Sequence, residues 1–93
     1  MPWANPLSDL LLAALHARRS ETASAVRLAR RAAAGFEAVD MAGYLAAARR
    51  RCGQLIGGAE GVDLVAQADT WMKSQGVANP ERFTAMLAPG FPS

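Results

Sequence analysis

Apolar residues recur at helical spacing from the start of the chain. Between residues 6 and about 19, leucine and alanine return every three or four positions, which predicts a helix with an apolar stripe. Asn5 followed by Pro6 marks its start, because asparagine accepts hydrogen bonds from free backbone N–H groups and proline suits the first helical position. The stripe consists of Leu7, Leu11, Ala14 and Leu15, widened by Leu10 and Leu12.

The same spacing predicts two helices in the middle of the chain. Ser20 is expected to cap a helix that ends near residue 37, and Asp40 a helix over about residues 41–55. Gly57 and Gly58 then end this third helix and turn the chain. The inner face of the second helix would be Ala25, Leu28, Ala29, Ala32 and Phe36. That of the third would be Tyr44, Leu45, Ala48, Cys52 and Leu55.

Two more helices complete the pattern. The fourth is expected over about residues 59–74, with Gly76 as its C-terminal cap. Asn79 and Pro80 repeat the start signal of the first helix and predict a short final helix over about residues 80–88. The fourth helix would bury Gly61, Leu64, Val65, Ala68, Trp71 and Met72. The final helix has an apolar side made of Phe83, Met86 and Leu87.

Two of these helices share an internal pattern. Segments 28–36 and 64–72 both read Leu, three residues, Ala, three residues and a large apolar residue, and they begin 36 positions apart. A small alanine between two bulky residues lets a neighbouring helix approach closely. The spacing is near the period of helix-turn-helix solenoid repeats, which usually bind other proteins.

The predicted fold is therefore all-α. We expect one helical-repeat domain over residues 1–93, built as a tetratricopeptide-like right-handed stack. Its first antiparallel hairpin would span about residues 6–37 and its second about 41–75, followed by the terminal helix at about 80–88.

Composition agrees with a small helical protein. Apolar residues make up 52% of the chain, but many are alanines that bury little area each. The single cysteine, Cys52, excludes an internal disulfide and suggests a reducing compartment. No apolar run is long enough to span a bilayer, and the leucine run before Arg18 lacks the basic start of a signal peptide. We therefore expect a cytoplasmic protein.

The net charge of +2 hides an uneven distribution. Eight arginines lie between Arg18 and Arg51, so the middle of the chain could attract nucleic acid, anionic lipid or an acidic protein surface. The triplet 49–51 lies on a helix, where consecutive side chains diverge by about 100°, so its members cannot all face one partner. One stem is expected along the core edge, and the others beside solvent or the carboxylates of Glu37, Asp40 and Glu60.

No motif for catalysis, metal binding or a cofactor is present. His16 is the single histidine and lacks ligand partners at metal-binding spacing, so we interpret it as a residue of a helix surface or end. Cys52 could be a reactive thiol beside the arginines, but its place on the inner stripe favours a small buried group. The glycines at 57 and 58 follow a helix and lack the Lys-Ser/Thr of a phosphate-binding loop.

The second half of the chain resembles a known family. Residues 47–61 (AARRRCGQLIGGAEG), 68–77 (ADTWMKSQGV), 79–82 (NPER) and 86–91 (MLAPGF) are similar to the C-terminal tetratricopeptide-like region of bacterial, myxobacterial-type, eukaryotic-like serine/threonine protein kinases. The first half fits less specifically, through residues 35–38 and Trp3. The resemblance implies a repeat module that follows a kinase domain in signalling proteins and contacts other proteins. The kinase motifs themselves are missing from this chain.

The sequence thus predicts a non-catalytic protein–protein interaction or scaffolding module that needs no cofactor or metal. An open end of the helix stack near the first hairpin predicts self-association or docking there. The expected partner-binding residues are Leu7, Leu10, Leu11, Arg18, Arg49 and Arg50. The alternative is a basic helical module that binds nucleic acid or anionic membrane through its arginine-rich helices; no base-reading side chains accompany the arginines, so such binding would be nonspecific.

Overall fold

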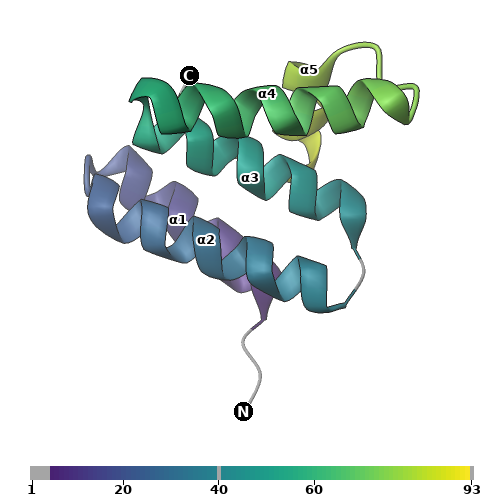
Figure 1. Ribbon diagram of the computed structural model, residues 1–93. Coiled ribbons are helices and arrows are strands. Elements are labelled where there is room, and N and C mark those ends of the chain that lie inside the picture. Colours follow the sequence, from purple (N-terminus) through teal and green to yellow (C-terminus); the bar gives the residue numbers. More distant parts are fainter. Residues whose placement is uncertain (1–4, 40, 93) are drawn as a thin grey trace.

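The computed structural model describes residues 5–39 and 41–92, which form an all-α fold without strands. Figure 1 shows the five helices, two antiparallel hairpins and a short last helix. Their bounds are α1 Pro6–Arg18, α2 Thr22–Ala38, α3 Ala42–Ile56, α4 Gly58–Ser74 and α5 Pro80–Leu87. These bounds lie within three residues of those expected from the hydrophobic pattern.

The helices pack in chain order. α1 lies along α2, α2 along α3 and α3 along α4, whereas α5 returns to pack mainly against α3 (Figure 1). Over the described helices, α1 has no comparable packing against α3. α3 is therefore the central helix, with neighbours on three sides.

The predicted helix ends are mostly confirmed. The Asn5 side chain accepts from the N–H groups of Leu7 and Ser8, and Asn79 accepts from that of Arg82. Gly57 has a φ of 68° and is the only residue between α3 and α4. After α4, Gly76 has a φ of 85°, and its N–H and that of the next residue bond back to the helix, as in a Schellman motif.

Ser20 does not cap α2, so this part of the sequence prediction is wrong. Its φ of 61° is left-handed, and its N–H donates to the carbonyl of Ala17 while that of Glu21 donates to His16. These bonds form a Schellman motif that ends α1. Glu21 occupies the N-cap of α2 without a side-chain cap bond. The expected cap Asp40 lies outside the described residues.

Small residues line the contacts between helices. The buried alanines come from all four long helices and lie opposite one another, as the alanine pattern predicts. Larger side chains fill the centre, where Phe36 and Met72 are fully buried and Phe36 stacks on Tyr44 with ring centroids 5.1 Å apart. The most buried alanines of the helices are Ala13, Ala25, Ala29, Ala32, Ala47 and Ala48.

α3 and α4 touch backbone to backbone at two glycines. A Cβ atom added to Gly53 would lie 2.6 Å from the carbonyl oxygen of Gly61, and one added to Gly61 would collide with the carbonyl of Gly53. No side chain fits at either position without separating the helices. Gly61 lies on the inner face of α4 as expected from the hydrophobic pattern, but periodicity alone does not indicate this contact.

The segment after α5 fills the space between α1 and α3. Ala88 is fully buried among residues of α1, α2 and α3, and Phe91 packs beside Ala13 and Leu28. Gly90 has a φ of 90° and lies against Ala14, so the Pro-Gly turn directs the chain back toward α1. The segment 88–92 thus packs against both helices of the first hairpin and against α3.

The glycine contact predicts opposite effects for two Gly→Ala substitutions in α3. Gly53→Ala should lower the free energy of unfolding by about 3 kcal/mol, because the new methyl group overpacks the α3–α4 contact. Gly43→Ala should raise it by up to about 1 kcal/mol, because alanine favours helix and its Cβ would meet Phe83 at an ordinary 3.5 Å. Denaturant titration of the two variants measures both effects, and similar stabilities would contradict the close contact.

Candidate protein-interaction surface

Four leucines of α1 remain exposed on its outer side. Leu7, Leu11 and Leu15 follow one another at intervals of four residues, and Leu12 extends the same side. Leu11 is 62% exposed and the other three 43–45%. We call these four residues the leucine face. The sequence analysis had placed them on one apolar stripe and expected Leu7 and Leu11 to be open.

Leu10, also expected to bind a partner, is instead a core residue. It is 3% exposed and packs with Phe36 and Ala88. The buried side of α1 otherwise consists of Asp9 and the alanines at 13, 14 and 17. Because alanines provide the packing, the helix keeps most of its leucines outside.

Contacts at both ends hold α1 in place. Pro6 packs on Gly35 of α2, where an added Cβ would lie 2.9 Å from the proline ring. Asp9 is buried and pairs with Arg31 of α2 at 3.4 Å. At the other end, the Arg18 Nε donates to the carbonyl of Gly90. The leucine face is therefore presented on a fixed helix rather than on a loop.

The triplet 49–51 diverges as expected, and each side chain has its own neighbour. Arg49 lies 3.5 Å from Glu37, a carboxylate that the sequence analysis named. Arg50 bonds to Asp69 at 2.7 Å, and only 11% of its side chain is exposed. Arg51 donates to the carbonyl of Ala88 at 3.1 Å and lies over the Phe91 ring at 5.0 Å.

These positions change the expected set of partner-binding residues. Arg50 is largely enclosed between α3 and α4, and Arg18 is bonded to the C-terminal segment through Nε. The side chain of Arg49 is 44% exposed and lies beside Glu37 of α2. Arg51, in contrast, contacts the C-terminal segment at Ala88. The six residues expected from sequence therefore do not form one continuous site. Of these six, Leu7, Leu11 and Arg18 lie together on the exposed side of α1.

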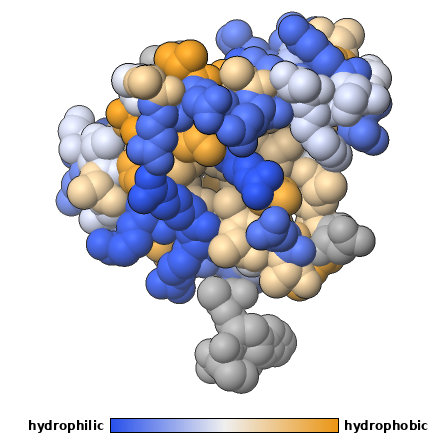
Figure 2. Space-filling view, in the orientation of Figure 1, coloured by the Kyte–Doolittle hydropathy of each residue, from blue (hydrophilic) through white to orange (hydrophobic). Residues whose placement is uncertain are grey.

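Ion pairs between helices neutralise much of the basic middle of the chain. Besides the pairs of Arg31, Arg49 and Arg50, Arg30 lies 3.2 Å from Glu60 of α4. Figure 2 shows hydrophilic side chains over the ends of α1 and α2 at the lower left, while hydrophobic ones gather at the upper left where α3 ends and α4 begins. Among the described arginines, Arg18, Arg19, Arg27 and Arg82 are exposed without an ion pair within 4 Å.

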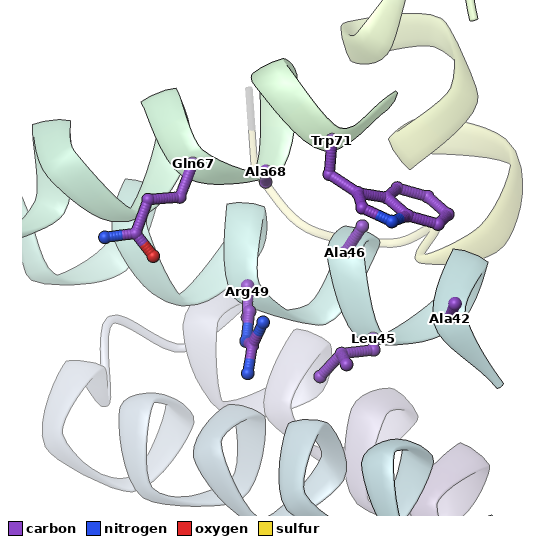
Figure 3. Close-up of a pocket in the computed structure, with 7 residues that line it drawn as sticks. All are labelled: Ala42, Leu45, Ala46, Arg49, Gln67, Ala68 and Trp71. Atoms are coloured by element: carbon purple, nitrogen blue, oxygen red, sulfur yellow. The ribbon is translucent and has the colours of Figure 1, made fainter. Parts of the chain in front are cut away.

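A small cleft lies between α3 and α4. Figure 3 shows the Trp71 indole lying beside Ala46, with Arg49 and Gln67 at the edges. Its volume is about 130 Å³. Sites for cofactors and drug-sized ligands usually measure about 300–1,000 Å³, so this cleft fits one side chain rather than such a molecule.

The other candidate residues have structural environments. His16 Nδ1 lies 2.6 Å from a Glu21 carboxylate oxygen at the end of α1, where the sequence analysis placed it. Cys52 is 3% exposed, which confirms the interpretation as a buried group. Burial raises the pKa of the Cys52 thiol, and the hydrogen bond and charge of Arg30 only partly oppose this. A reactive thiolate is therefore disfavoured at this site.

Within residues 5–39 and 41–92, His, Cys, Asp and Glu side chains nowhere gather in threes that could hold a metal ion. Over the same residues, none of the helices has both the length and the apolar character needed to cross a membrane. No family model matches the chain, and neither a curated protein nor a solved structure is significantly similar to it.

The raised pKa of Cys52 predicts that stability falls at alkaline pH. The unfolded thiol ionises near its ordinary value of 9.0, whereas the buried thiol stays protonated, so the unfolded state loses a proton first. The stabilising contribution is complete below about pH 8 and is lost as the pH rises past 9. Denaturant titrations from about pH 6 to 10 should show the wild type losing stability relative to Cys52→Ala above pH 9. A constant difference would contradict the raised pKa.

Proposed function

We propose that this chain is a non-catalytic protein-interaction module that docks a partner through the leucine face of α1. The observation that carries the proposal is the exposure of Leu7, Leu11, Leu12 and Leu15 together on a capped, well-packed helix. Single exposed leucines are ordinary on protein surfaces, but a contiguous set on one helix is typical of an interaction site.

The energetics support docking at this face. Complete burial of an exposed leucine contributes about 1.5–3 kcal/mol, so covering four half-exposed leucines contributes on the order of 4 kcal/mol. A partner must supply further contacts to reach micromolar affinity, which requires about 8 kcal/mol. The leucine face would then be the centre of a larger interface.

We propose further that the helices form a tetratricopeptide-like stack. The serial packing of α1 to α4 and the buried Ala32 and Ala68 at equivalent places in α2 and α4 support this relation. Together with the resemblance in residues 47–91, it supports a role as a kinase-associated module of bacterial cytoplasmic signalling.

The alternative function, nonspecific binding of nucleic acid or anionic membrane, has less support. It requires unneutralised positive charge, and four arginines of the middle region lie within 4 Å of carboxylates. Titration with duplex DNA and with anionic vesicles at about 50 and 200 mM salt tests it directly. Binding that falls steeply with salt would favour the alternative over protein docking.

A charge placed in the leucine face should abolish partner binding. Leu11→Glu would bury an unpaired carboxylate in the interface, and we expect proteins enriched from a lysate of the source organism to fall by at least about tenfold. Val62→Glu is the matched control, because Val62 is 69% exposed on α4, away from α1. Quantitative mass spectrometry of the two captures, with circular dichroism to verify folding, measures the difference. Equal captures by the two variants would contradict the proposal.

A further inference from the structure

We propose that the partner of the leucine face is an amphipathic helix of another protein, with acidic residues at the end that lies beside Arg18 and Arg19. This inference rests on the proposed function, since it names the partner of the same surface. It follows from the shape of the face and from the distribution of charge along α1.

The shape fits a helix. Leu7, Leu11 and Leu15 form a ridge along α1 with a four-residue period, and such ridges pack into the grooves of a second helix. The C-terminal segment borders one side of this ridge, because Gly90 rests on Ala14 and bonds to Arg18. Leu12 borders the other side. A single helix of a partner could therefore lie along α1 on the leucine face, as in helix-in-groove recognition.

The exposed charges of α1 itself have one sign, and the nearby carboxylate of Glu21, just after the helix, lies 2.6 Å from His16 Nδ1. Asp9, the single carboxylate of α1, is buried against α2 and pairs with Arg31, so it does not reach the surface. Arg18 and Arg19 are exposed at the C-terminal end of the helix. Acidic residues of a partner at this end would gain attraction, and basic ones would be repelled.

A second copy of this chain fits less well. Two α1 helices side by side in parallel would bring their Arg18 and Arg19 together. An antiparallel pair would place these arginines beside the positively polarised N-terminus of the other helix. Neither arrangement supplies a carboxylate from α1 itself.

Two designed peptides test the charge requirement. Both are fluorescently labelled 18-residue helices with leucine at every third or fourth position; one carries three glutamates in its first turn and the other three lysines. We expect the acidic peptide to bind at least about tenfold more tightly than the basic one at 50 mM salt, by fluorescence anisotropy. The difference should shrink at 300 mM salt, because these charges are exposed to solvent.

Variants of the protein locate the interaction. Arg19→Glu should reduce the preference for the acidic peptide by about fivefold or more, whereas Arg27→Glu, an equally exposed arginine of α2, should leave it unchanged. Leu11→Glu should weaken binding of the acidic peptide. Equal affinities for the two peptides, no binding of either below about 200 μM, or a wild-type dimer that Leu11→Glu dissociates in analytical ultracentrifugation would each overturn the inference.

The failure of this inference and that of the proposed function are distinguishable. If both peptides bind equally but Leu11→Glu still abolishes capture of lysate proteins, the leucine face remains the proposed docking site. In that case only the inference of an acidic helical partner is wrong. Should Leu11→Glu leave the captured proteins unchanged, the docking site itself would be wrong.

Discussion

The close approach of α3 to its neighbours is the constraint on which the rest of the structure depends. α3 packs against α2, α4 and α5, and its buried positions are Ala46, Ala47, Ala48, Cys52 and Gly53. The fully enclosed positions of this helix therefore hold small residues. Its larger side chains, such as Tyr44 and Leu45, are only partly buried, and the fully buried large side chains include Phe36 of α2 and Met72 of α4.

The same use of small residues explains why leucines of α1 remain exposed. α1 packs through Ala13, Ala14 and Ala17, so that it lies close to α2 and to the C-terminal segment. With alanines toward the core, Leu10 is the one leucine of α1 that is fully buried, and the other four leave a large part of their side chains exposed. An exposed set of this kind on one helix is the reason why we propose a docking role for it.

Much of the fold could be predicted from the sequence because its signals are local. Asn5-Pro6, Asn79-Pro80 and the glycines at 57 and 76 mark helix ends by backbone chemistry that a sequence displays directly. Ser20 misled the prediction, since its residue type suits a cap whereas its position ends the preceding helix.

The exposed residues of the candidate surface could be predicted only in part, for a physical reason. In a helix with leucines and alanines on most sides, periodicity does not show which set is buried, so Leu10 was assigned to the surface with Leu7 and Leu11. The partners of Asp9, Arg18 and Arg51 come from distant parts of the chain. No local pattern encodes such contacts.

The contact between Arg18 and Gly90, 72 positions apart, has a consequence for how the protein is made. During translation α1 and α2 leave the ribosome long before the Pro-Gly turn does, and the surface around Ala13 and Leu28 that Phe91 covers stays open until then. The first hairpin therefore cannot complete its native packing until the C-terminal segment has been synthesised. Stalled or prematurely terminated chains would expose that surface and become substrates for chaperones and proteases.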